Sequence, residues 1–370
     1  MTAPGRHLFT VGREKTEERG IMGGTVENKE WFLSSYVAEG VPTSEHLKIR
    51  TVRVDVSVDS IPEAHVAVQI LLLSVDPYLR SMMSGQKGGL DLPQLEINQV
   101  VSSFGLGRII GSKNMHYKSG DLVVSPFFPA AEYCVTDSIF LRKIDDKDSQ
   151  IPLTEYLSAL GIPGFTAWVG MLLIGIPKPG ENIYVSAAAG AVGMYAGQLA
   201  KIKGCRVVGS TGTDEKVNLL KEEFGFDDAF NYKRETDFDA ALSKYCPNGI
   251  DIYFDNVGGK MLEAVLNHVN KHARIPLCGM ISQYNQVWSN REGVRNLLNL
   301  VGKEVKMEGF LIGSHIHRRG EFAAEIEGYM KQGKIKSKHQ IYSGIDSFLE
   351  ALASIFSGSN VGKVILQLSK

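Results

Sequence analysis

A strand-like apolar segment runs directly into a glycine-rich turn and then into a helical stretch between residues 182 and 204. The turn has the pattern A-x-x-G-x-x-G, with Ala187, Gly190 and Gly193 at its fixed positions. Small residues there let the backbone turn tightly and approach a diphosphate, whose charge the N-terminus of the following helix stabilises. The alternative is a glycine-rich packing contact, but a strand before and a helix after are the context that favours the binding turn. The segment therefore predicts a dinucleotide-binding α/β fold.

Strand-sized apolar runs alternate with helical stretches from about residue 154 onward, which is typical of a parallel sheet built from βαβ units. We expect strands at 182–187, 206–210, 229–232, 251–255, 274–279 and 305–312. We expect helices at 191–203, 214–224, 237–245, 261–269, near 294–301 and around 321–334. About six strands in this order predict a doubly wound sheet.

Short alternating apolar runs separated by turn residues fill 31–152, which indicates a β-rich domain. A further strand, helix and strand at the C-terminal end are expected to return to that domain. We therefore predict a loose extension at 1–21, a discontinuous β-rich substrate domain at 22–155 and 328–370, and a nucleotide-binding domain at 156–327.

The charge balance and the cysteines narrow the class of partner. The chain has 370 residues, of which 40 are basic and 41 acidic, so its net charge is −1. We therefore expect a small-molecule ligand and no nucleic acid or anionic membrane as partner. Four cysteines without a C-x-x-C pair speak against disulfides and structural zinc, which favours a reduced, cytoplasmic protein. The apolar stretch 168–176 is too short to span a bilayer.

The residues after the second predicted strand indicate which dinucleotide binds. An NAD enzyme carries an acidic residue about 20 positions past the glycine turn, on the ribose 2′-hydroxyl. This chain has Ser210 and Thr211 there, followed by Lys216, all of which suit a 2′-phosphate. The pattern favours NADP(H) as the cofactor. The alternative role for Lys216 is that of a solvent-exposed lysine on a helix.

Several separate motifs occur in an order that resembles one family. They are VDPYLR at 75–80, GIPGFTA at 161–167, the glycine turn, TDEK at 213–216, FNYK at 230–233, FDNVGG at 254–259, CGMISQYN at 278–285 and NVGK at 360–363. From about Glu27 to Lys370 the chain resembles the zinc-free medium-chain dehydrogenase/reductases, in the branch of leukotriene and prostaglandin reductases and plant alkenal double-bond reductases. The resemblance implies a doubly wound Rossmann sheet plus a GroES-like β-rich domain, and a homodimer through the edge of the nucleotide-domain sheet.

The resemblance also implies a role for individual positions. The diphosphate would be held by Gly190, Ala191, Val192 and Gly193, and the 2′-phosphate end by Ser210, Thr211, Lys216 and Tyr232. Asn256 would meet the ribose, and the nicotinamide would be lined by Cys278, Gly279, Ile281, Ser282 and Tyr284 and covered by Phe310, Leu311, Ile312 and Asn360. Thr166 is expected as a further cofactor-binding residue. Structural alternatives stay open for three of these, since Tyr232 suits the end of a strand and Asn256 and Asn360 suit turns. The segment 127–133 (FFPAAEY) departs from the Trp-rich stretch common in the family, so the substrate pocket is expected to differ in shape.

No metal site is predicted. His46, His65 and His116 are the histidines of the β-rich stretch 31–152, and none precedes a glutamate as the catalytic zinc sites of related dehydrogenases require. His268 and His272 would share a helix face if their helix continued, and such a pair is usually a solvated helix end.

Without a metal to polarise a carbonyl, the chemistry that remains is hydride transfer to a carbon already activated by conjugation. We therefore predict that NADPH reduces the C=C bond of an α,β-unsaturated aldehyde or ketone, with hydride to Cβ and a proton to Cα. The enolate needs a hydrogen-bond donor and a proton source, for which we predict Tyr284, with Tyr78 orienting the carbonyl. Packing roles for both tyrosines, with water as the proton source, are the alternative.

Two other functions remain open at this stage. An NADPH:quinone reductase shares the same plan, and a nucleotide-binding protein without turnover is a different class. The sequence does not distinguish phenylpropenals, lipid-derived enals, chalcone-like enones and eicosanoids as substrates, although the VDPYLR and CGMISQYN motifs favour phenylpropanoid and reactive alkenal substrates.

Overall fold

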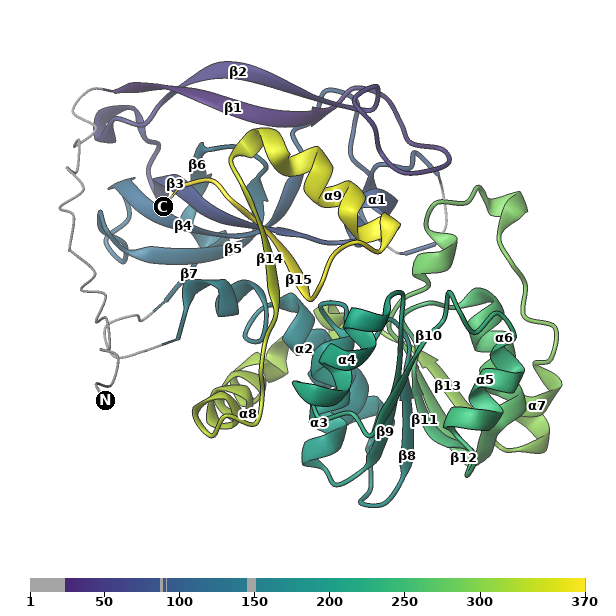
Figure 1. The fold of residues 1–370 in the computed structure, drawn as a ribbon. Helices are drawn as coiled ribbons and strands as arrows, with labels where there is room; N and C mark the ends of the chain where they lie inside the picture. The colour runs from purple at the N-terminus through teal and green to yellow at the C-terminus, as the bar shows by residue number, and fades with distance from the viewer. Residues whose placement is uncertain (1–23, 87–88, 91, 145–150, 370) are drawn as a thin grey trace, which may run out of the picture.

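The computed structural model describes residues 24–86, 89–90, 92–144 and 151–369, and within them the chain forms two large sheets (Figure 1). The extension predicted at 1–21 lies outside the described residues. The α/β class, with a parallel Rossmann-type sheet and a separate, mostly antiparallel sheet, is confirmed.

The parallel sheet has six strands in the order β10-β9-β8-β11-β12-β13. The strands are β8 (Asn182–Val185), β9 (Arg206–Thr211), β10 (Asp228–Asn231), β11 (Ile250–Phe254), β12 (Val269–Leu277) and β13 (Lys306–Gly309). Chain order and spatial order reverse between β8 and β11, which is the point at which doubly wound sheets bind their ligands.

Helices cover both faces of this sheet, with α3 and α4 on one side and α5, α6 and α7 on the other (Figure 1). They are α3 (Gly193–Ile202), α4 (Asp214–Glu222), α5 (Phe238–Tyr245), α6 (Gly259–His268) and α7 (Leu298–Gly302). Side chains of β8 point alternately to the two faces of the sheet and so contribute to two hydrophobic cores. Ile183 and Val185 pack with α3, whereas Tyr184 points to the opposite face. There Tyr184 stacks on Phe230 of β10 and on Tyr253 of β11, so one aromatic layer extends across this face of the sheet.

The second sheet has the order β14-β15-β3-β4-β5-β7, with β6 pairing β3. Its strands are β3 (His65–Val75), β4 (Ser102–Ser112), β5 (Leu122–Pro129), β6 (Tyr133–Asp137), β7 (Arg142–Lys143), β14 (His339–Ser343) and β15 (Lys363–Gln367). The C-terminal strand β15 runs antiparallel to β3, so residues from both halves of the chain form one sheet. The hairpin of β1 (Thr25–Leu33) and β2 (Leu47–Asp55) and the helix α9 (Phe348–Ser357) lie on the same side of it in Figure 1.

The remaining helices lie at the borders of the two sheets. They are α1 (Tyr78–Met82), α2 (Ile162–Trp168), which continues as a π-helix (Val169–Gly175), and α8 (Arg319–Lys331). Short 3₁₀ turns occur at Val58–Ser60, Ser138–Phe140, Leu153–Leu157, Ile281–Gln283, Trp288–Asn290, Ile312–Arg318 and Ile345–Ser347. None of the helices in the described ranges is long and apolar enough to cross a membrane.

Two local predictions are wrong. The helix expected near 294–301 is only the short α7, and the strand expected at 305–312 ends at Gly309, because the chain turns into a 3₁₀ segment at Ile312. The helix of His268 does not continue to His272, so the condition under which these two histidines would share a helix face is not met. Helix α6 ends at His268, β12 begins at once, and His272 has a φ of 65°. His268 Nε2 instead contacts Asp239 Oδ1 at 3.0 Å.

Candidate active site

A cavity of about 870 Å³ runs along the carboxyl ends of the parallel strands and reaches the second sheet. All of the site residues predicted from the sequence line this cavity, although they come from many separate segments. They are Tyr78, Thr166, Gly190, Ala191, Val192, Gly193, Ser210, Thr211, Lys216, Tyr232, Asn256, Cys278, Gly279, Ile281, Ser282, Tyr284, Phe310, Leu311, Ile312 and Asn360. Their individual roles remain predictions.

The glycine turn between β8 and α3 is built without room for larger side chains. Ala187 has a φ of 47°, in the left-handed region, and a Cβ at Gly193 would lie 2.5 Å from the Ala187 carbonyl oxygen. Helix α3 begins at Gly193, so its N-terminal N–H groups face the turn. From the C-terminal segment, the Gly362 N–H donates to the Ala189 carbonyl at 2.9 Å, which ties the second sheet to this turn.

Lys216 lies buried at the end of the cavity formed by β9 and α4. It is 7 % exposed, and its Nζ donates to the carbonyl oxygen of Gly358 at 2.7 Å. Burial lowers the pKa of the Lys216 ammonium, and the nearby Lys233 lowers it further. The described residues place no carboxylate in an ion pair with Lys216, so an anion would be stabilised here.

A buried aspartate holds the turn after β11 in place. Asp255 Oδ1 accepts hydrogen bonds from the Tyr253 hydroxyl at 2.7 Å and from the N–H groups of Val257 and Gly258 at 2.8 Å each. Burial raises the pKa of Asp255. The turn directs Asn256 towards the glycine turn, where Asn256 Nδ2 donates to the Ser186 carbonyl at 2.8 Å. The side-chain oxygen Oδ1 of Asn256 is therefore the end of the amide that can contact a ligand.

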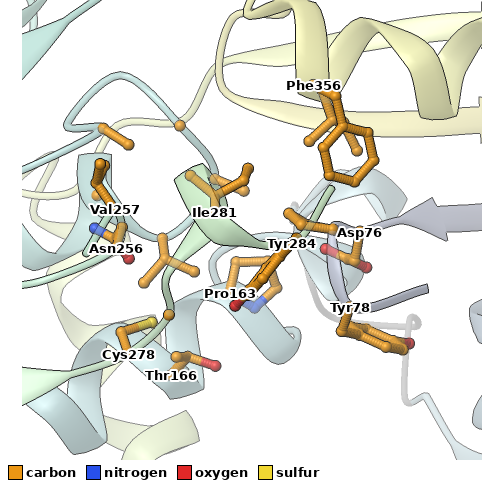
Figure 2. A pocket seen from close by; sticks show the side chains of 18 of the residues that line it. Asp76, Tyr78, Pro163, Thr166, Asn256, Val257, Cys278, Ile281, Tyr284 and Phe356 are labelled. Atoms are coloured by element: carbon orange, nitrogen blue, oxygen red, sulfur yellow. The ribbon is translucent and has the colours of Figure 1, made fainter. Parts of the chain in front are cut away.

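Tyr284 folds back over the segment that follows β12. Its hydroxyl accepts a hydrogen bond from the Met280 N–H at 3.3 Å, and Figure 2 shows the hydroxyl end pointing towards the side of the cavity that holds Pro163, Thr166 and Cys278. Burial raises the pKa of Tyr284 to about 12, with smaller contributions from Cys278 and Asp255. Burial also raises the pKa of the Cys278 thiol to about 12. Both groups are therefore protonated at neutral pH.

Tyr78 stands at the other wall, and its hydroxyl end points away from Tyr284 in Figure 2. Burial raises its pKa well above 10, Asp76 raises it further, and contacts with Ser103 and the Phe104 backbone on β4 oppose the shift. The hydroxyl of Tyr78 is thus directed towards β4, so the ring of Tyr78 faces the cavity more directly than its oxygen does.

A buried ion pair beside Tyr78 was not predicted from the sequence. Lys363 Nζ donates to Asp76 Oδ1 at 2.9 Å and to the Val75 carbonyl at 2.8 Å, and Lys363 is fully buried. The Ser74 hydroxyl donates to the other oxygen of Asp76. Asp76 lines the cavity, so this pair joins β3 and β15 directly under the substrate side of the site.

Three further lining residues, Pro163, Val257 and Phe356, were also missed (Figure 2). Asp76, Pro163 and Val257 stand inside quoted motifs, so motif membership was the available signal. Phe356 lies in the last turn of helix α9, where nothing in the local pattern distinguishes it from a packing residue. Among the described residues, no group of three or more His, Cys, Asp or Glu side chains could hold a metal ion.

These features fit a dinucleotide with a 2′-phosphate. The turn from Ala187 to Gly193 leaves space for a diphosphate beside backbone N–H groups, and the buried Lys216 supplies a cation to a second anionic group. The cavity joins these two places to Cys278 and Tyr284, so the reactive end of such a ligand would lie beside Tyr284.

Two family models match the chain. Residues 191–328 match a zinc-binding dehydrogenase model, and residues 29–144 match the N-terminal domain of an oxidoreductase.

Proteins with related sequences match along almost the whole chain. The (+)-pulegone reductase of Mentha piperita is 42 % identical, over 93 % of this chain and 99 % of that protein. The NADP⁺-dependent 2-alkenal reductase of Nicotiana tabacum is 42 % identical, over 94 % of this chain and 100 % of that protein. Among solved structures, CurA of Vibrio vulnificus in complex with NADPH superposes with a TM-score of 0.85 at 35 % identity, covering 92 % of this chain and 99 % of that one.

Proposed function

The chain belongs to the alkenal and enone reductase branch of the medium-chain dehydrogenase/reductase superfamily, and we propose that it reduces the conjugated C=C bond of α,β-unsaturated aldehydes and ketones with NADPH. The observation that carries this function is the single cavity that joins the glycine turn, the buried Lys216 and the hydroxyl of Tyr284. The overall reaction converts the enone or enal, NADPH and a proton into the saturated carbonyl compound and NADP⁺.

The cofactor-binding residues are proposed by position. The N–H groups around Gly190 and Gly193 hold the diphosphate, and Lys216, with Ser210, Thr211 and Tyr232, holds the 2′-phosphate. When bound, NADPH supplies a hydride for the Cβ atom of the substrate. Cys278 and Gly279 lie beside the reactive end, and neither presents a charge there.

Tyr284 is proposed to donate a hydrogen bond to the developing enolate oxygen and then to transfer this proton to Cα, after which solvent water reprotonates the tyrosinate. Its pKa of about 12 keeps the hydroxyl protonated, and the apolar surroundings strengthen its hydrogen bond to an oxyanion. Tyr78 is proposed to orient the substrate carbonyl from the opposite wall. Since the Tyr78 oxygen is directed towards β4, the variant Tyr78→Phe separates a role of the hydroxyl from a role of the ring.

The substrate side of the cavity is mostly apolar. The apolar residues that line the cavity include Met82, Leu90, Leu92, Leu95, Phe127 and Phe356. These side chains favour the hydrocarbon or aryl part of an enone. We propose phenylpropanoid and reactive alkenal substrates.

The chain is proposed to be a cytoplasmic homodimer organised in two domains, a discontinuous substrate domain at 22–155 and 328–370 and an NADPH domain at 156–327. All four cysteines are free thiols, which supports a reducing compartment. Strand β13 ends the parallel sheet, and Leu298 and Val301 on the neighbouring α7 are 79 % and 74 % exposed, which supports pairing of two copies along this edge. Light scattering on the purified protein tests the dimer.

The experiment that tests the function is NADPH consumption with a hydroxycinnamaldehyde, hydroxynonenal, benzalacetone, a chalcone and a quinone, each repeated with NADH and with a chelator. We expect turnover of the enals and enones with NADPH, unaffected by the chelator, and a product with the carbonyl intact. In D₂O the new deuterium should be at Cα. Consumption with the quinone alone would instead indicate a quinone reductase, and no consumption at all would indicate a nucleotide-binding protein without turnover.

A further inference from the structure

The peptide of Gly40 is held from both sides of the cleft. Gly40 lies between β1 and β2, and its N–H donates to the carbonyl oxygen of Asn285 at 2.8 Å. Its own carbonyl oxygen accepts a hydrogen bond from Arg80 Nε, also at 2.8 Å. Arg80 is on the short helix α1 with Tyr78, and Asn285 follows Tyr284 directly. A chain of two hydrogen bonds therefore connects the segments that carry the two tyrosines.

Arg80 is an unusual residue to find at such a position. It is 1 % exposed, and within the described residues it forms no ion pair, while its Nη2 atom has no hydrogen-bond partner. Burial lowers the pKa of Arg80 to about 10, and the neighbouring Arg291 adds to this effect. The guanidinium is nevertheless charged at neutral pH. A buried cation without a counter-charge costs stability, and proteins keep such groups mainly where function requires them.

Other contacts show that the same two segments meet over a wider area. Asn290 Nδ2 donates to Glu39 Oε1 at 3.4 Å, one residue before Gly40. A Cβ at Gly89 would lie 3.6 Å from Arg291 Nη1, so the segment after α1 also approaches this place. The connection through Gly40 is thus part of a contact between the parallel-sheet part of the chain and the N-terminal part.

We propose that Arg80 is a positioning residue for the reduction: through Gly40 and Asn285 it fixes where Tyr284 stands relative to Tyr78. The inference rests on the proposed role of Tyr284 in the reaction. A catalytic group must be held within a fraction of an ångström to act, and a misplacement of about 1 Å costs on the order of 100-fold in rate. Arg80 touches neither the cavity nor the ligand-binding turn, so its effect should be on turnover and not on cofactor binding.

A matched pair of variants isolates the hydrogen bond. In Arg80→Gln the amide nitrogen lies as many bonds from Cα as the Nε of arginine and can donate to Gly40, whereas Arg80→Met has the same length and no donor. We expect Arg80→Met to lower kcat roughly 10- to 100-fold with the Kd for NADPH unchanged, and Arg80→Gln to recover most of kcat. Arg108→Met, on the exposed face of β4, is the control and should behave as the wild type.

Hydrogen exchange gives a readout that does not depend on activity. The Gly40 amide should exchange faster in Arg80→Met than in the wild type or in Arg80→Gln, because its partner segment is less well held. Equal exchange and equal kcat in all three proteins would overturn the inference, as would equal losses in Arg80→Gln and Arg80→Met. If Arg80→Met does not fold, Gly40→Ala replaces it. Gly40 has a φ of 78° with nothing within 4 Å, so a methyl group strains only its backbone, and kcat should fall at constant NADPH affinity.

The double variant Arg80→Met/Tyr284→Phe separates this inference from the proposed function. If Arg80 acts through Tyr284, the double variant should be no slower than the slower single variant, whereas multiplied losses would overturn the inference. A slow Tyr284→Phe beside a fully active Arg80→Met would overturn the inference alone. A fully active Tyr284→Phe would overturn the proposed role of Tyr284 and the inference with it.

Discussion

The hydroxyl oxygen of Tyr284 occupies the space that a side chain at Gly279 would need: a Cβ at Gly279 would lie 2.7 Å from that oxygen. Gly279 has an ordinary φ, so glycine is required here for room and not for backbone freedom. The motif that contains both residues therefore couples the end of β12 to the position of the tyrosine hydroxyl.

Gly279→Ala should displace Tyr284 while leaving the fold intact. We expect kcat for an enone to fall roughly 10- to 100-fold, because the methyl group moves the hydroxyl away from the substrate. Gly320→Ala is the control, since that glycine lies in α8 with nothing within 4 Å of its added Cβ. Wild-type turnover in Gly279→Ala would show that the tyrosine can act from another position.

Tyr284→Phe removes the proposed acid and leaves the ring. We expect turnover to fall roughly 10²–10⁴-fold, with the Kd for NADPH unchanged. Because the acid must be protonated and its pKa is about 12, the wild-type rate should show no decline from this group through neutral and mildly alkaline pH. A loss of less than about threefold would assign the proton to water.

Lys216→Ala tests the choice of cofactor. A charge-assisted hydrogen bond contributes about 1.5–3 kcal/mol, so the KM for NADPH should rise on the order of 10- to 150-fold. The KM for NADH, which lacks the phosphate, should barely change. Equal effects on both cofactors would contradict the assignment of Lys216 to the 2′-phosphate.

The buried ion pair of Lys363 and Asp76 should be required for stability. This pairing was not predicted from the sequence. Removing one partner of a buried pair typically costs about 3–5 kcal/mol, because the other charge is left without compensation. Lys363→Met should therefore lower the unfolding temperature clearly, and Lys363→Met/Asp76→Asn should recover part of the loss. A Lys363→Met protein as stable as the wild type would contradict a stabilising role of the pair.

His339 should make the protein less stable in mild acid. Burial, together with Lys363, lowers its pKa from 6.5 to about 4, so the unfolded chain binds a proton more readily than the folded one between these values. The stability that the neutral His339 contributes is fully present above pH 6.5 and is lost progressively as the pH drops towards 4. Burial raises the pKa of Glu155, so protonation of this group favours the folded state as the pH falls and offsets part of the loss.

The variant His339→Gln isolates the histidine contribution. Its unfolding temperature should fall less than that of the wild type between pH 7 and pH 5, as thermal scans at the two pH values would show. An identical fall in both proteins would assign the acid sensitivity to other groups.

The sequence predicted the positions of the parallel strands along the chain and the glycine turn because both depend on local features. Apolar periodicity and small residues at Ala187, Gly190 and Gly193 are visible within one short segment. The pairing of Lys363 with Asp76 was not predictable in the same way, since it joins positions 287 residues apart. The hydrogen bond from Arg80 to Gly40 was not predicted for the same reason, since it also joins residues far apart in the sequence.

Segments with weak periodicity were predicted least well. The stretch from Ile281 to Leu297 has short 3₁₀ turns and no long helix, and its conformation depends on contacts such as the one from Glu292 N to Gln283 Oε1 at 2.7 Å. His272 illustrates the same limit. The local sequence does not show where α6 ends, because β12 begins at Val269, which pairs with Ile250 on β11.

The antiparallel pairing of β15 with β3 has a consequence for the order in which the protein assembles during synthesis. Domains generally fold as they emerge from the ribosome, N-terminal parts first. Here all six strands of the parallel sheet have been made once Gly309 has emerged, whereas β3 waits for Val364 to Gln367 at the far end of the chain. The part of the sheet that is made first is thus completed last, and the edge of β3 at residues 72–75 gains its strand partner only when β15 has been made.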